Sequence, residues 1–114
     1  MVSGAGARTP EELEALFEDA LVLRDCELLA GLYEEHAVLL TASAGSALGA
    51  RTCIQLALVL WQGDRVYVAD PQTVTQMQDV ALVVSSDCIS VMRRDREGSW
   101  RYAIVLQGRE FRKE

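Results

Sequence analysis

The chain is poor in the residues that usually carry metal and redox chemistry. Its 114 residues include one histidine, three cysteines and two prolines. A single histidine excludes a histidine-based metal cluster, and the wide spacing of Cys26, Cys53 and Cys88 matches no zinc or dithiol motif. We therefore expect three free thiols that pack as small hydrophobic side chains in a reducing cytoplasm, and no cofactor.

Positive charge and long hydrophobic runs are scarce as well. Eleven lysines and arginines stand against seventeen acidic residues, a net charge of −6, which disfavours non-specific binding to nucleic acid or to an anionic membrane. The longest apolar run, residues 54–61, is far too short to span a bilayer. The N-terminus lacks the charged and apolar segments of a signal peptide, so we expect a flexible tail over residues 1–8 and one domain over residues 9–114.

What the chain does contain is a globular composition, half apolar and a quarter charged, and a well-marked first helix. Thr9 and Pro10 are typical of an N-cap and a first helical position, and Glu12 would complete a capping box. Apolar residues then recur at helical spacing and form one stripe: Leu13, Leu16, Phe17, Ala20 and Leu21. The acids between them are assigned to the solvated face: Glu11, Glu14, Glu18 and Asp19.

Further elements follow in the order of an α+β domain. Asp25 should cap a second helix that ends near His36, which we interpret as a solvated histidine at a helix C-terminus. Residues 37–42 predict a strand, 51–62 a third helix, and 65–69, 72–78, 80–94 and 99–107 further strands. This order predicts N-terminal helices packed on a curved, mainly antiparallel sheet that encloses a pocket.

Two of the predicted strands are apolar on both faces. Residues 80–84 and 103–106 show no alternation with polar residues, so both faces of the sheet should be buried. Three helices cover only one face, and a second copy of the chain is the expected cover for the other, although the sheet could instead curl over its own core. Simple alternation places four residues in the homodimer interface: Trp100, Tyr102, Ile104 and Leu106.

Several short phrases, taken in order, resemble the NTF2-like superfamily with its cystatin-like cone fold. The phrases are residues 24–25 followed by 29–33, then 37–39, 50–54, 79–83 and 98–104. The last is most similar to the actinobacterial members grouped around enediyne biosynthesis, and SnoaL-like proteins belong to the same superfamily. The superfamily includes polyketide cyclases and ketosteroid isomerases. Its members usually place another strand and turn before the final hairpin. Residues 80–94 are therefore either one long strand that bends near residues 85–87, or part of a sheet that is a strand short with a more open cone.

The resemblance does not extend to the isomerase mechanism. Ketosteroid isomerases use an aspartate base with a tyrosine and a protonated acid that hold the enolate oxygen. The matching positions here carry Thr41, Phe17 and Ser90, and Val105 stands where close relatives often have aspartate. None of these side chains can perform the corresponding role, so the resemblance supports the fold and argues against that chemistry.

Three functions remain open from the sequence. The first is a protein that binds a small apolar molecule, with Thr41, Ser90 and Gln107 as hydrogen-bonding groups. Its predicted pocket residues are Phe17, Leu39, Thr41, Leu58, Trp61, Cys88, Ser90, Val105 and Gln107. The second is an enzyme of the cyclase or isomerase kind with Asp87 as its base, and the third is a non-catalytic homodimeric association module. A nucleophilic role for Cys88 is disfavoured because no partner base is evident.

Overall fold

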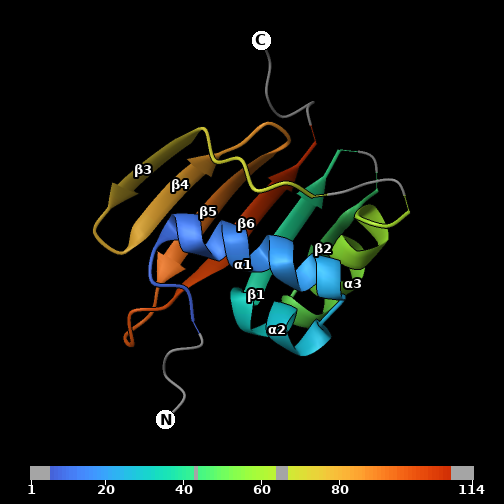
Figure 1. Ribbon diagram of the computed structural model, residues 1–114, viewed down its shortest axis with the longest axis horizontal. Helices are drawn as coiled ribbons and strands as arrows, with labels where there is room; N and C mark the ends of the chain where they lie inside the picture. Colours follow the sequence, from blue (N-terminus) through green and yellow to red (C-terminus); the bar gives the residue numbers. More distant parts are fainter. Residues whose placement is uncertain (1–5, 43, 64–66, 109–114) are drawn as a thin grey trace.

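The computed structural model describes residues 6–42, 44–63 and 67–108. Its elements, in chain order, are α1 Pro10–Leu23, α2 Cys26–Leu32, β1 Tyr33–Thr41, β2 Ser46–Leu48, α3 Ala50–Leu60, β3 Thr73–Met77, β4 Val80–Val84, β5 Cys88–Arg94 and β6 Trp100–Gln107. The six strands form one sheet in the order β2-β1-β6-β5-β4-β3, in which only β1 and β6 run parallel. In Figure 1, α1 lies across the sheet, with α2 and α3 beside β1 and β2. The predicted α+β class is confirmed.

The two N-terminal helices begin where their capping residues predict. The Thr9 hydroxyl accepts a hydrogen bond from the Glu12 amide at 3.0 Å, and the Asp25 carboxylate accepts one from the Leu28 amide at 3.1 Å. Each bond satisfies an amide that has no partner within its helix. The Glu12 carboxylate accepts from the Arg8 amide at 2.7 Å, one residue before the partner that a capping box would use.

Residues 6–8 are docked onto the sheet, although the sequence assigned them to a flexible tail. Ala7 is fully buried and forms an isolated bridge with Trp100, whose amide donates to the Ala7 carbonyl at 2.9 Å. The Gly6 backbone lies so close to Ser99 that a Cβ atom would stand 2.2 Å from the serine hydroxyl oxygen. The tail prediction is therefore wrong for these residues, and residues 1–5 lie outside the described part of the chain.

Residues 80–94 form two antiparallel strands. β4 and β5 pair from Val80 with Arg93 to Val84 with Ile89, and the Ser85 amide donates to the Cys88 carbonyl at 2.8 Å across the turn. Ser85, Ser86 and Asp87 are residues that favour turns. The segment is therefore not one long strand: the bend expected near residues 85–87 is a turn that divides it into two strands of the six-stranded sheet. Of the strand expected at 65–69, residues 67–69 are described and are not part of a strand.

His36 lies in β1 and not at the end of a helix. α2 ends at Leu32, and Tyr33 already has extended backbone angles, φ −108° and ψ 147°. β1 therefore begins directly after the helix, and the β1–β6 register shifts between Tyr33 and Val38. The exposed His36 side chain falls within this irregular stretch, so the prediction of a histidine near a helix C-terminus is wrong.

A β-bulge in β6 reverses the expected alternation of its side chains. Met92 pairs with Tyr102 and Val91 with Ile104, which leaves Ala103 as the extra residue. As a result, Trp100 and Tyr102 face the core, with exposed fractions of 1% and 2%, whereas Ile104 is 40% exposed on the opposite face. The prediction that Trp100 and Tyr102 belong to an outer interface is wrong. Ile104 and Leu106 remain on the outer face.

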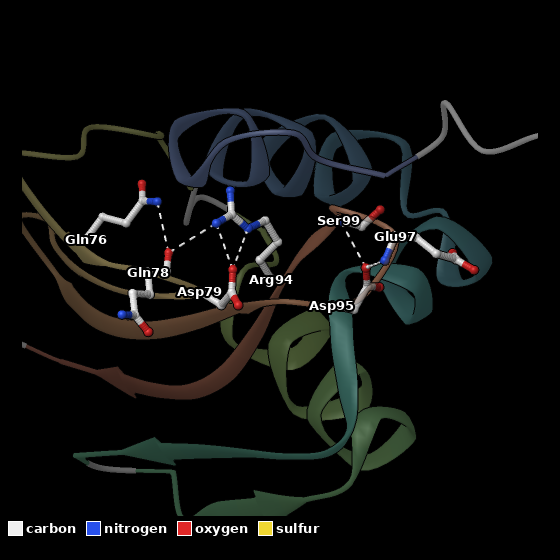
Figure 2. A network of polar contacts seen from close by, with 7 residues as sticks. All are labelled: Gln76, Gln78, Asp79, Arg94, Asp95, Glu97 and Ser99. Atoms are coloured by element: carbon white, nitrogen blue, oxygen red, sulfur yellow. Dashed lines mark hydrogen bonds and ion pairs between the residues drawn. The ribbon is translucent and has the colours of Figure 1, made fainter.

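The hairpin end of the sheet is held by polar contacts, as Figure 2 shows. The Asp95 carboxylate accepts hydrogen bonds from the amides of Ser99 at 3.0 Å and Glu97 at 2.9 Å. These bonds, the Ser99 amide first, lower the pKa of Asp95. The Arg94 guanidinium donates to the Asp79 carboxylate at 2.8 Å. These contacts are partly solvated and structural.

Candidate functional site

A buried glutamate on α1 is the most unusual feature of the interior. Glu14 is 1% exposed, although the sequence assigned it to the solvated face of the helix. It lies beside Leu13 and one turn before Phe17, so it borders the apolar stripe. The sheet covers more of the circumference of α1 than the apolar stripe occupies. The position one turn before an aromatic residue is the only local signal that could have indicated burial.

Two tyrosine hydroxyls contact the Glu14 carboxyl group. Tyr67, from the segment between α3 and β3, donates to Oε1, and Tyr102 of β6 donates to Oε2 at 2.9 Å. Burial raises the pKa of Glu14, and the charge of Asp70 adds to the rise, whereas the tyrosine hydrogen bonds oppose it. Burial also raises the pKa of both tyrosines. The site therefore holds an interior carboxyl group that retains its proton more strongly than a solvated glutamate.

Aromatic rings surround this carboxyl group. Phe17 packs edge-to-face against Tyr67 at 5.0 Å between ring centroids, against Tyr102 at 5.4 Å and against Tyr33 at 6.1 Å. Trp61, which follows α3, packs edge-to-face on Tyr67 at 5.2 Å. Edge-to-face contacts are the favourable arrangement for aromatic pairs. They fix the tyrosine hydroxyls in place and exclude water from the carboxyl group.

The interior of the cone retains a cavity of about 10 Å³, which is room for roughly one water molecule. Most of the predicted pocket residues line it: Phe17, Leu39, Trp61, Cys88, Ser90, Val105 and Gln107. The sequence missed other lining residues: Tyr33, Ala57, Leu60, Tyr67 and Tyr102. The missed tyrosines come from the start of β1, the bulged part of β6 and an irregular segment. In these places no periodic pattern indicates which way a side chain points. The role of these residues in ligand binding remains a prediction.

Two predicted pocket residues lie elsewhere. The Thr41 hydroxyl donates to the Gly45 carbonyl at 2.6 Å and accepts from the Ala44 amide at 2.8 Å, so it closes the β1–β2 hairpin. Leu58 packs against the core from the side of α3, while Ala57 and Leu60 of the same helix face the cavity. Successive helical residues are rotated by about 100°, and this rotation places Leu58 outside the cavity wall.

Trp61 and Tyr67 separate the inner cavity from the surface. Both side chains also line a hollow of about 100 Å³ together with Val68, Asp70, Ser85, Asp87 and Cys88. They line a second hollow of about 300 Å³ beside Glu18, Leu21, Val22, Arg24, Gln62 and Gly63. Asp87, the base predicted from sequence, thus lies at the outer hollow with Asp70 and not in the inner cavity.

The segment that carries Tyr67 is fastened to its surroundings by polar contacts. The Ala69 amide donates to the Glu18 carboxylate at 3.0 Å, and the Ser86 hydroxyl donates to the Asp70 carboxylate at 2.5 Å. Arg24 holds the nearby end of α3, because its guanidinium donates to the Trp61 carbonyl at 2.7 Å and the Leu58 carbonyl at 2.9 Å. The two aromatic side chains at the mouth therefore belong to backbone held by a few surface contacts.

The cysteines do not form a reactive centre. Cys26 is exposed, Cys53 and Cys88 are buried, and all three are free thiols. The Cys88 thiol donates to the Gln107 side-chain oxygen at 2.7 Å, and burial raises its pKa, which disfavours the thiolate that a nucleophile requires. Within the described residues, no group of three or more His, Cys, Asp or Glu side chains could hold a metal ion. No helix in this part of the chain is both long and apolar enough to cross a membrane.

Comparisons with known proteins identify the fold. No family model matches the sequence, and no curated protein matches it. Among solved structures, a ketosteroid isomerase-like protein from Erwinia carotovora atroseptica is similar with a TM-score of 0.68 and 17% identity, over 84% of this chain and 89% of that one. An NTF2-like protein from Pseudomonas putida KT2440 has a TM-score of 0.61 and 16% identity, over 85% of this chain and 81% of that one.

A third similar structure is the putative calcium/calmodulin-dependent protein kinase type II association domain from Thiobacillus denitrificans. It has a TM-score of 0.69 and 14% identity, over 90% of this chain and 97% of that one. The chain has the NTF2-like, or cystatin-like, cone fold. At these identities the similarity establishes the fold alone.

Proposed function

We propose that this protein binds a small, largely apolar molecule inside the cone. The observation that carries the proposal is Glu14, a carboxyl group buried among aromatic rings with Tyr67 and Tyr102 as its hydrogen-bond donors. Burying a carboxyl group costs free energy that an apolar side chain at the same position would not cost. Glu14 does not itself line the inner cavity, but both of its hydrogen-bond donors, Tyr67 and Tyr102, do. A polar group beside an apolar cavity can orient a bound molecule.

Entry of a ligand requires Tyr67 and Trp61 to move. These two side chains form the wall shared by the inner cavity and the two outer hollows. Their displacement would join the cavity to the hollows and enlarge the available space. Cys88 and Gln107, which contact each other at 2.7 Å on the inner wall, offer a second polar contact to a molecule that lies along β5 and β6.

Binding is tested by thermal shift against toluene, phenol, indole and 2-naphthol. A molecule that binds only the folded state raises the melting temperature. Val105 and Ile104 are neighbours on β6 that face opposite sides of the sheet, and they give a matched pair of variants. Val105→Phe should abolish the shift by filling the cavity, while Ile104→Phe should preserve it. No shift for any compound with the wild-type protein would contradict the proposal.

A second candidate is an enzyme that moves a proton, with Glu14 as the acid or base in place of Asp87. A carboxyl group with a raised pKa and adjacent hydroxyl donors is the set of groups that proton transfer beside a carbonyl requires. One similar structure is described as ketosteroid isomerase-like. Exchange of the α-protons of cyclohexanone in D₂O, followed by NMR, tests this candidate. If it is correct, Glu14→Gln slows the catalysed exchange by about 10²–10⁴-fold and Asp87→Asn does not.

We also propose that the protein forms a homodimer through the outer face of its sheet. Cross-strand partners share a face, so the register forms one aliphatic row across five strands: Leu48, Val38, Ile104, Val91 and Leu82. A second row lies beside it: Leu40, Leu106, Ile89 and Val84. The association domain from Thiobacillus denitrificans provides a precedent for association in a similar fold.

The size of this face is compatible with a dimer. Six strands about 4.8 Å apart and about six residues long at about 3.3 Å per residue cover roughly 500 Å² in plan. Side chains raise the accessible area above that figure, toward the roughly 800 Å² that each partner buries in a stable interface. Sedimentation equilibrium at micromolar concentration should give twice the monomer mass, and a monomer at every concentration would contradict the dimer.

A further inference from the structure

The groups that face Glu14 provide hydrogen bonds but no positive charge. The tyrosine hydroxyls donate to both carboxylate oxygens, and none of the hydrogen bonds or ion pairs found in the described residues joins Glu14 to a lysine, arginine or histidine. The ion pairs found in the described residues instead engage Glu34, Asp79 and Asp95. Without a counter-ion, ionised Glu14 is an expensive group to bury.

The walls around Glu14 suit a cation. The rings of Phe17 and Trp61 pack on Tyr67 at centroid distances of 5.0 and 5.2 Å, so they border the space that Tyr67 would leave if it moved outward. A cation in that space would face Glu14 Oε1 and lie against two aromatic rings. Aromatic faces attract cations, and the attraction grows where water is excluded.

Acidic residues occur at the outer hollow and are in excess over the whole chain. The outer hollow of about 100 Å³ is lined by the acids Asp70 and Asp87, and its described lining residues include no basic side chain. The net charge of the whole chain is −6. The net negative charge of the chain favours the approach of a cation over that of an anion.

We infer that the ligand of the cone is a small organic cation, a ring compound bearing a primary amine, and that Glu14 is its counter-ion. This inference rests on the proposed binding function and names the class of ligand. The ammonium group would take the place of the Tyr67 hydroxyl as the donor to Glu14 Oε1. If Glu14 carries a proton beforehand, the ammonium ion binds as an ion pair with the carboxylate and one proton passes from Glu14 to the solvent.

The inference is tested with benzylamine, benzyl alcohol and toluene, which share a ring and differ in the polar group. Isothermal titration calorimetry at neutral pH should show benzylamine binding at least about tenfold more tightly than benzyl alcohol, because only the amine has a charge to pair with Glu14. Titration in phosphate and in Tris, which differ in ionisation enthalpy, counts the protons released on binding. Glu14→Gln should remove the preference for benzylamine over benzyl alcohol, because glutamine cannot form the ion pair with the ammonium group.

The pH dependence has a definite sign. Affinity for benzylamine should rise as the pH increases from about 5 to about 8, because protons compete with the amine for a carboxyl group whose ordinary pKa is about 4.3 and is raised here. The other titratable groups that face Glu14 are Tyr67, Tyr102, Tyr33, Cys88 and Asp70. Burial raises the pKa of the tyrosines and of Cys88 further above their ordinary values, so these groups remain neutral in that range.

The outcomes separate this inference from the function on which it rests. Equal binding of benzylamine and benzyl alcohol to the wild-type protein would overturn the cation inference and leave apolar binding in place. Binding of none of the three compounds would overturn both. A preference for benzylamine that survives Glu14→Gln but disappears in Asp70→Asn/Asp87→Asn would also overturn the inference, because the counter-ion would then lie at the mouth.

Discussion

Cys88, Ser90 and Met92 point from β5 into the cone, whereas Ile89 and Val91 of the same strand point to the opposite face. The contrast extends across the sheet. The inner face combines aromatic rings, hydroxyls and a thiol around Glu14, and the outer face carries aliphatic rows. Polar groups at fixed positions favour recognition of one small molecule. An aliphatic surface without such groups gains affinity by burying a large area, which favours association with another protein chain.

The largest expected effect is the difference in stability loss between truncations on the inner and outer faces of the sheet. Met92 is fully buried on the inner face, and Leu82, on the adjacent strand, is 43% exposed on the outer face. Met92→Ala should lower the free energy of unfolding by about 2–5 kcal/mol, because the cavity it leaves cannot collapse completely. Leu82→Ala should cost about 1 kcal/mol or less at concentrations where the protein is monomeric. Urea denaturation measures both, and equal losses would mean that the faces are not distinct.

A charge on the outer face should separate the proposed dimer. Ile104→Lys places an ammonium group in the middle of an aliphatic row and should weaken association by about 100-fold or more, because the charge would be buried without a partner. Val22→Lys is the matched control, since Val22 is exposed on α1, away from the outer face. Analytical ultracentrifugation measures the two dissociation constants, and an equal effect of both variants would place the interface elsewhere.

The buried Glu14 should make the free energy of unfolding depend on pH. Burial raises the pKa of Glu14 in the folded state, so its contribution is fully present below the unfolded value of about 4.3 and is lost as pH rises through the folded value. Glu14→Gln has no such titration. The wild-type protein should therefore lose stability relative to the variant as pH increases above about 4.3. Parallel curves from urea denaturation would show that Glu14 titrates normally.

The smallest effect concerns the thiols. Cys88 lies on the inner face, Cys53 is buried on α3 and Cys26 is exposed. A thiol reagent should modify Cys26 quickly and the other two only after denaturation, and the melting temperature should be the same with and without reductant. Rapid modification of Cys88 would show that the cone opens readily, while a lower melting temperature on reduction would indicate a disulfide.

Local signals in the sequence determined the helices, their caps and the α+β order. Thr9 and Asp25 accept hydrogen bonds from amides three residues further along the chain. The spacing of apolar residues within one element is likewise local, so it predicts that element without knowledge of distant contacts. The same signals correctly indicated that β4 and β6 have apolar residues on both faces. Most of the cavity lining also followed from the resemblance and from strand alternation, because the inner residues of β5 keep a regular period of two.

The tertiary structure alone decided the centre of the site. The pattern of α1 alone predicts a solvated Glu14, because only the sheet covers that side of the helix. Tyr67 contacts Glu14 from a segment that has no periodic pattern. Tyr102 faces inward because the bulge at Ala103 shifts the register of β6, a displacement that becomes visible only against β5. Each of these features depends on contacts between residues far apart in the chain, and the free energy of such contacts appears in no local pattern.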